Sequence, residues 1–217
     1  RRVLFRSNHS QLWEANDGGV WLSVNGGSSW NPKSDGIIST EVYHAAQSKV
    51  REDLVSIGTQ DNGELFHSLT TWKCNRGGDW GAACDFDYTH NNYVYYLSEN
   101  QRRRLIPNGG TVSMNLPVQC DGNTHISFCP SDTNVAYAGR DTLCYSPNIY
   151  NGSISWGIVA ALGHTIRGIK VNPLKSDVVY VVTDNARVYR IEDAKSGNPT
   201  ISIFTLPYAT NVSASIE

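Results

Sequence analysis

The sequence has 217 residues and a net charge of -2 at pH 7, with eleven tyrosines and nineteen glycines against one methionine. A nucleic-acid-binding surface needs an excess of basic residues, and this balanced charge argues against one. No stretch approaches the roughly eighteen consecutive apolar residues of a membrane-spanning helix. The aromatic and glycine content favours strands and turns over helices.

Residues 1–7, RRVLFRS, fit none of the pattern that follows them. A common sequencing-adapter end, CTCTTCCGATCT, translates as Leu-Phe-Arg-Ser, which is the sequence at positions 4–7. We therefore expect residues 1–7 to be an assembly artefact on a truncated, metagenomic reading frame. A truncated frame also accounts for the lack of a visible signal peptide.

Five pairs of short apolar runs recur along the chain. In each pair the first run leads into an acid or amide, and the second run follows within a few residues. Each pair predicts a β-hairpin whose turn carries the polar residue. The polar positions recur every 39–44 residues and are Asp17, Asp61, Asn100, Asp141 and Asp184.

Further strands flank these hairpins. Apolar runs precede the last four at residues 41–47, 83–90, 125–132 and 165–173, and a closing run such as ISIFTLP follows at 201–207. Four strands in about 40–45 residues is the period of a propeller blade, and no helical period competes. The sequence therefore predicts an all-β fold, a β-propeller of four-stranded antiparallel blades. We expect residues 8–217 to hold about five blades of a larger ring, the first blade incomplete at its N-terminal side.

The segment SVNGGSSW, residues 23–30, predicts a tight turn that ends on a tryptophan. Asn25 can fold its side chain back onto the backbone, as residues of Asx-turns do. Gly27 permits a positive φ, and the hydroxyls of Ser23 and Ser29 supply local hydrogen bonds. We expect Trp30 to fold under the turn and to pack between blades.

The same segment matches the pattern S-x-[D/N]-x-G-x-[S/T]-W and resembles the Asp-box of BNR-repeat propellers. In that family the box is the turn between the third and fourth strands of a blade. Weaker copies are SLTTW at 68–72, NGGTV at 108–112, NGSISW at 151–156 and DAKSGNPT at 193–200. The boxes of that family lie on the outside of the ring, so the resemblance implies a fold more than a function.

The resemblance extends over nearly the whole chain after residue 8. NDGGVWLSVNGGSSW, GTQDNGELFHS and GGDWGAACDFDY follow one another as in secreted bacterial Asp-box proteins, a group that resembles xyloglucanase-type glycoside hydrolases and the sortilin ectodomain. This likeness implies a secreted, periplasmic or cell-surface location. The group usually reads GGDGG where this chain has Asp79 followed by Trp80, so a tryptophan stands on a loop where glycine is common.

Candidate ligand-binding residues come from the loops that enter the innermost strands, where propellers usually meet ligands. An aromatic side chain there can stack on a sugar, and polar side chains can bind its hydroxyls. The turn at Gln60 and Asp61 is the most elaborated hairpin turn and is added, although a β-turn closed by glycine is its favoured interpretation. The candidates are Tyr43, Gln60, Asp61, Trp80, His164 and Arg167.

Two aspartates are candidates for catalysis. A glycosidase needs two carboxylates, about 5–5.5 Å apart for retention and about 6.5–9.5 Å apart for inversion. Asp79 and Asp85 could supply them. The favoured alternative is that Asp79 caps a glycine turn and that Asp85 and Asp87 hydrogen-bond neighbouring backbone, because a fold does not imply catalysis.

The cysteines suggest two local disulfides. Cys74 and Cys84 flank one loop and Cys120 and Cys129 another, so either pair could bond in an exported protein. Buried free thiols are the alternative, and Cys144, inside a strand-like run, is expected in the core. No zinc-ligand spacing occurs, so we expect no metal and no cofactor.

Two functions therefore remain open. We favour a non-catalytic module that binds polysaccharide or an extracellular protein, with no nucleic-acid partner and no membrane span. The alternative is a glycoside hydrolase of the xyloglucanase type, with paired carboxylates at the propeller axis. His44, His90 and His125 are scattered over strands and turns, and no role is assigned to them.

Overall fold

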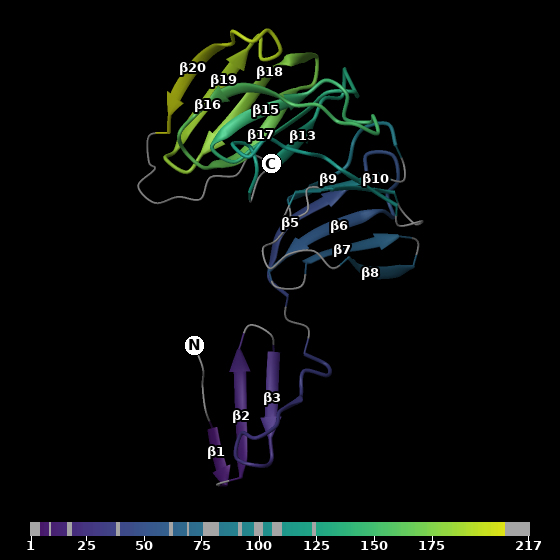
Figure 1. Cartoon of the computed structure of the whole chain (residues 1–217), viewed down its shortest axis with the longest axis vertical. Helices are drawn as coiled ribbons and strands as arrows, with labels where there is room; N and C mark the ends of the chain where they lie inside the picture. Colours follow the sequence, from purple (N-terminus) through teal and green to yellow (C-terminus); the bar gives the residue numbers. More distant parts are fainter. Residues whose placement is uncertain are drawn as a thin grey trace. The chain divides into compact units, whose positions relative to one another are not determined.

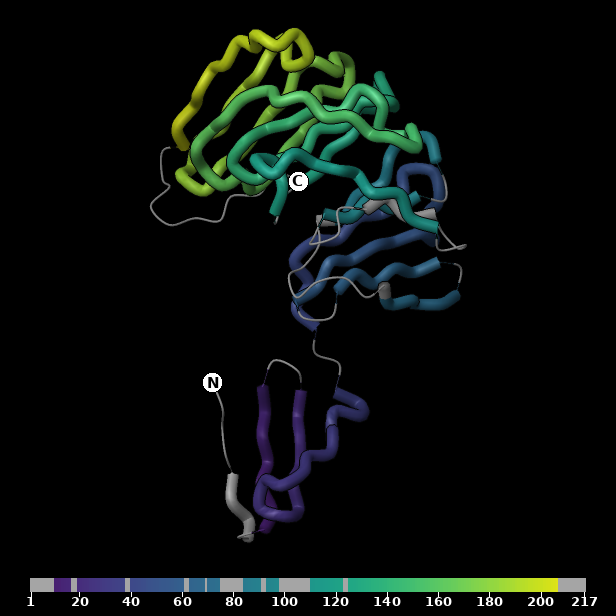
Figure 2. The backbone as a smooth tube through the Cα atoms, in the orientation of Figure 1, coloured from purple at the N-terminus to yellow at the C-terminus, as the bar shows by residue number. Residues whose placement is uncertain are grey.

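The computed structural model describes residues 5–8, 10–16, 19–37, 40–60, 63–68, 70–75, 83–90, 93–97, 102–105, 110–122 and 125–206. Within these residues every regular element is a strand, and twenty strands form five four-stranded antiparallel sheets. Each sheet uses four strands that are consecutive in the chain (Figures 1 and 2). The predicted succession of four-stranded antiparallel units is confirmed.

The first sheet belongs to a compact unit of its own, residues Arg1–Glu41. The sequence predicts that the first blade lacks strands at its N-terminal side. This prediction is wrong, because residues 5–8 pair with the strand that follows them and complete a four-stranded sheet. An open strand edge offers unsatisfied backbone groups, and an extended segment beside it completes their hydrogen bonds. The strands are β1 (Phe5–Asn8), β2 (Gln11–Asn16), β3 (Gly19–Ser23) and β4 (Asn31–Pro32).

The second compact unit, residues Val42–Glu217, holds the other four sheets. The first two of them contain β5 (Val42–Gln47), β6 (Val55–Thr59), β7 (Gly63–Ser68), β8 (Thr71–Asn75), β9 (Ala83–Asp85), β10 (Tyr93–Leu97), β11 (Arg102–Leu105) and β12 (Thr111–Ser113). The last two contain β13 (His125–Phe128), β14 (Ala136–Gly139), β15 (Thr142–Ser146), β16 (Gly157–Ala161), β17 (Ile166–Asn172), β18 (Lys175–Thr183), β19 (Arg187–Glu192) and β20 (Thr200–Thr205).

The four sheets of the second unit meet through their first strands. β5 contacts β9, β9 contacts β13, and β13 contacts β17. The apolar core fills the spaces between successive sheets, and alternate residues of one strand serve both sides. On β10, Val94 packs toward the preceding sheet, whereas Tyr95 packs on Phe128 of the following sheet with ring centroids 4.6 Å apart. This packing brings the beginnings of the first strands together.

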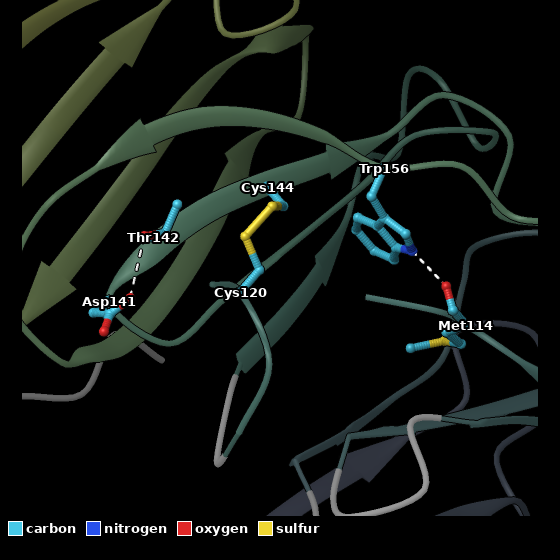
Figure 3. The surroundings of a disulfide bond; sticks show 6 residues. All are labelled: Met114, Cys120, Asp141, Thr142, Cys144 and Trp156. Carbon is cyan, nitrogen blue, oxygen red and sulfur yellow. Dashed lines mark hydrogen bonds between the residues drawn. A yellow bond between two sulfur atoms is a disulfide. The ribbon is translucent and has the colours of Figure 1, made fainter. Parts of the chain in front are cut away.

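A disulfide joins Cys120 to Cys144, with Cα atoms 6.2 Å apart (Figure 3). The predicted local pairs are therefore wrong: Cys74, Cys84 and Cys129 are not part of this disulfide, and of the three only Cys74 is exposed. The prediction pairs cysteines that are close in the sequence. In the structure the loop after β12, which carries Cys120, packs instead against β15, the third strand of the next sheet, which carries Cys144. Cys144 is fully buried, as expected of a core residue.

The turn after β3 has the local hydrogen bonds that its sequence predicts. The Ser29 N–H donates to Asn25 Oδ1 at 2.9 Å, and the Gly27 N–H donates to Ser23 Oγ at 2.8 Å. Gly27 has a φ of +94°, and a Cβ placed there would lie 3.9 Å from Trp30 Cζ2. The indole therefore lies next to the turn, and its packing between blades stays a prediction.

A second turn, between β15 and β16, repeats this hydrogen-bond pattern with a different amide from the predicted one. The sequence points to the amide of Asn151, but Asn148 Oδ1 accepts hydrogen bonds from Ser155 N–H at 3.0 Å and from Ser155 Oγ at 3.1 Å. The turn is longer than the one at residues 23–30, and its extra length carries Ile149 and Ile154 into the core. Burial of these side chains explains the altered spacing.

Candidate functional site

Tyr43 lies at the beginning of β5, in a distorted part of the strand. The residues on either side of it pair with two consecutive residues of β6, Thr59 and Gly58, so Tyr43 is the extra residue of a β-bulge. Tyr43 is 41% exposed. Bulges often occur next to binding sites, because the extra residue re-aims a side chain.

Arg167 occupies the corresponding place on β17. The residues on either side of it pair with consecutive residues of β18, Thr183 and Val182, so Arg167 is also the extra residue of a bulge. Its side chain is exposed. Two first strands of the same unit therefore begin with a bulge that presents a predicted ligand-binding residue.

Two histidines lie beside these bulges. His44 follows Tyr43 on β5, and His125 is the first residue of β13. Their imidazole rings meet edge to face with centroids 4.7 Å apart. β13 contacts β17, and the charge of Arg167 acts on the His125 imidazole, so we group His44, His125 and Arg167, from the strand starts of three sheets, as one cluster.

The cluster keeps its imidazoles neutral. Burial lowers the pKa of His44, and burial together with the nearby His44 and Arg167 lowers the pKa of His125 to about 3. No carboxylate raises either pKa. Neither imidazole forms a hydrogen bond, and Arg167 forms no hydrogen bond or ion pair, with the residues that the structure describes. These nitrogen atoms are therefore available to a ligand.

His164, another predicted ligand-binding residue, lies in the turn before β17. Its Nδ1 is 3.7 Å from Asp184 Oδ1, and 42% of its side chain is exposed. Gln60 is the last described residue after β6, where it follows Thr59 directly. That either residue shares a site with the histidine cluster stays a prediction.

Asp85, a predicted catalytic residue, ends β9. Its Oδ1 accepts a hydrogen bond from the Phe86 N–H at 2.8 Å and is 3.7 Å from Lys49 Nζ. Burial raises the pKa of Asp85, although the nearby Lys49 and Lys170 oppose this change. The carboxylate is held by backbone and lysine contacts, and its side chain is 21% exposed.

Asp87 has a structural role that the sequence predicts. It is fully buried, and its Oδ1 accepts hydrogen bonds from the N–H groups of Thr89 and His90 at 2.7 and 2.6 Å. Its Oδ2 accepts a hydrogen bond from the Tyr95 hydroxyl at 3.0 Å. The expectation that Asp85 and Asp87 hydrogen-bond neighbouring backbone is confirmed.

Three predicted site residues lie outside the described part of the chain. They are Asp79, Trp80 and Asp61. Their roles in catalysis and binding therefore stay predictions.

His44 and His125 belong to the cluster although their sequence predicts no role for them. Scattered histidines carry no motif, and each is separated from the other by a whole sheet in the chain. A signal was nevertheless present, because both fall within the opening residues of predicted first strands. Aligning those strands by blade position would have placed the two imidazoles together.

The described residues contain no group of three or more His, Cys, Asp or Glu side chains arranged to hold a metal ion. The described part of the chain also contains no helix with the length and apolar character needed to cross a membrane.

No protein-family description matches the chain, and no curated protein matches it. Among solved structures the chain is similar to the GH74 enzyme of Niastella koreensis, with a TM-score of 0.57 and 16% sequence identity. The alignment covers 93% of this chain and 37% of that chain. At this identity the likeness shows the fold alone. Together with the four-stranded sheets, it supports a β-propeller fold.

Proposed function

We propose that this chain is part of a secreted Asp-box β-propeller that binds polysaccharide where its first strands begin, without catalysing a reaction itself. The observation that carries the proposal is the pair of equivalent bulges that present Tyr43 and Arg167. An exposed aromatic ring can stack on a sugar, and a guanidinium can donate to its hydroxyls. An extracellular protein is the other partner class for the same surface.

Three other features support parts of this proposal. The disulfide between Cys120 and Cys144 suits an oxidising compartment outside the cytosol. The turns at Asn25 and Asn148 share a hydrogen-bond pattern, which supports the resemblance to Asp-box repeats. The likeness to a GH74 enzyme supports the propeller fold on which this surface depends.

Affinity electrophoresis through gels that contain a soluble polysaccharide tests the proposal. Xyloglucan, galactan and polygalacturonate are suitable, with the whole chain as the sample. Tyr43→Ala and Arg167→Ala should each migrate through the polysaccharide gel as fast as the unmodified chain migrates through a gel without polysaccharide. Trp72→Ala is the matched control, since Trp72 is 56% exposed on β8, away from the first strands. Retardation that neither site variant changes would contradict the proposed surface.

A second candidate function is glycoside hydrolysis, and the raised pKa of Asp85 favours it. A general acid of a glycosidase must hold its proton near neutral pH, and burial is a common means of raising a carboxyl pKa. Release of reducing sugar from xyloglucan would measure this activity. Asp85→Asn and Asp79→Asn should each abolish it, and turnover unchanged by a substitution would remove that residue from the mechanism.

A further inference from the structure

Arg167 differs from most described arginines of its unit in having no acidic partner. Arg51, Arg140 and Arg190 each form an ion pair with a carboxylate one or two residues away. Arg167 forms no ion pair or hydrogen bond with the residues that the structure describes. An exposed guanidinium held by a backbone bulge therefore presents its donors to whatever occupies the site.

The two imidazoles beside Arg167 add further hydrogen-bonding groups without adding a negative charge. The rings of His44 and His125 are half-buried and hold each other edge to face, with centroids 4.7 Å apart. A neutral imidazole offers one N–H donor and one acceptor nitrogen. All three side chains of the cluster can therefore donate hydrogen bonds, and the two imidazoles can also accept them. The half-buried position of the imidazoles keeps part of the solvent away from these groups.

This combination fits a carboxylate attached to a sugar better than a neutral sugar. A guanidinium matches the two oxygen atoms of a carboxylate in a planar, bidentate arrangement, and such charge-assisted hydrogen bonds are about twice as strong as neutral ones. The acceptor nitrogens of the imidazoles would then be available to the hydroxyl groups beside the carboxylate. A sulfate ester is also an anion, and two of its oxygen atoms can accept parallel hydrogen bonds from a guanidinium, so a sulfated probe is needed to separate the two anions.

We propose that His44, His125 and Arg167 bind a uronic acid, with its carboxylate on Arg167, so that the ligand of this propeller is an acidic, uronate-bearing polysaccharide. The inference rests on the proposed function, because it names the substrate class of the same surface. Arg167 binds the carboxylate, and the two histidines position the sugar through its remaining polar groups. Polysaccharides built only from neutral sugars are expected to bind weakly.

Isothermal titration of the whole chain tests this assignment with three probes of similar backbone. These are polygalacturonate, polygalacturonate with its carboxyl groups methyl-esterified, and neutral galactan. The expected result is that polygalacturonate binds at least about tenfold more tightly than the other two, as a lost charge-assisted hydrogen bond implies. A sulfated galactan serves as a fourth probe and distinguishes a carboxylate from a sulfate ester as the bound anion.

Variants locate the effect. Arg167→Gln should weaken polygalacturonate binding about tenfold or more and should weaken the binding of galactan by a smaller factor. His44→Gln and His125→Gln should each weaken polygalacturonate binding by a smaller factor. Arg187→Gln is the matched control: Arg187 is exposed at the start of β19, has no acidic partner among the described residues, and changes the net charge equally. Circular dichroism verifies that each variant is folded.

The outcomes separate this inference from the proposed function. Equal affinity for polygalacturonate, its methyl ester and galactan would overturn the carboxylate assignment and leave polysaccharide binding in place. Equal affinity for the sulfated probe would overturn specificity for carboxylate. An equal loss in Arg167→Gln and Arg187→Gln would show a general charge effect and overturn the site. Binding to none of the polysaccharides would overturn both proposals.

Discussion

Trp156 donates a hydrogen bond from its indole Nε1 to the backbone oxygen of Met114 at 2.6 Å, across 42 residues of chain (Figure 3). Met114 is fully buried, and its carbonyl lies in the segment that leads from β12 to β13. The indole comes from the turn before β16. The hydrogen bond therefore holds the segment between β12 and β13 against the turn before β16, the last strand of the sheet that follows.

Replacing Trp156 by phenylalanine should lower the free energy of unfolding by about 1–3 kcal/mol, because the partly buried carbonyl loses its donor while most apolar contact remains. Urea unfolding followed by circular dichroism measures the change. Trp72→Phe is the control, since that indole is 56% exposed, and it should change stability by less than about 0.5 kcal/mol. Equal effects of the two substitutions would contradict a special role for the Trp156 hydrogen bond.

Removal of the disulfide should destabilise the chain. Cys120 and Cys144 close a loop with a sequence separation of 24, and the chain-entropy model assigns such a loop about 3–4 kcal/mol of stabilisation. The double variant with serine at both positions should unfold at lower urea concentration by this amount. A reducing agent should have the same effect on the unmodified chain and none on the variant. Cys74→Ser, at an exposed cysteine outside this disulfide, is expected to change stability far less than the double variant.

The amide of Asn148 should contribute measurably to stability, although the residue is only half-buried in a turn. Asn148→Ala removes the acceptor for both the N–H and the hydroxyl of Ser155, which should cost about 1–2 kcal/mol of unfolding free energy. Asn198→Ala removes an amide from another exposed turn without a side-chain bond to the described residues. Thermal unfolding should show a lower Tm for the first variant only. Similar Tm values for both variants would mean that the Asn148 bonds contribute nothing to stability.

Acid should destabilise the fold through His125. Its ordinary pKa of 6.5 falls to about 3 in the folded chain, so between these values only the unfolded chain binds the proton. Stability is therefore complete above about pH 6.5 and decreases as the pH falls toward 3, by at most about 1.4 kcal/mol per pH unit. Unfolding free energies at pH 7 and pH 5 measure the loss.

His125→Gln should reduce the difference between these two pH values, because glutamine does not titrate. His164→Gln is the control, since 42% of the His164 side chain is exposed, and it should retain the pH dependence of the unmodified chain. A His125 variant that loses as much stability at pH 5 as the unmodified chain would assign the acid sensitivity to other groups.

Much of the fold follows from local patterns in the sequence. Alternating and clustered apolar runs with polar turns predict the hairpins of β6 with β7 and of β14 with β15, because strand pairing across a short turn depends on neighbouring residues alone. The turn at Asn25 and the backbone hydrogen bonds of Asp87 are local for the same reason. Tyr43 and Arg167 could be nominated because they stand at predicted strand starts.

Contacts between sheets depended on the tertiary structure. The partner of Cys144, the meeting of His44 with His125 and the bulges at two strand starts arise from how separate sheets pack and how their ladders slip by one residue. Spacing along the chain carries no record of such distances. By itself the sequence determined repeated four-stranded units and their turns, because these involve neighbouring residues. Only the tertiary structure brought three strand starts together into one cluster, because side-chain packing between the sheets sets their relative positions.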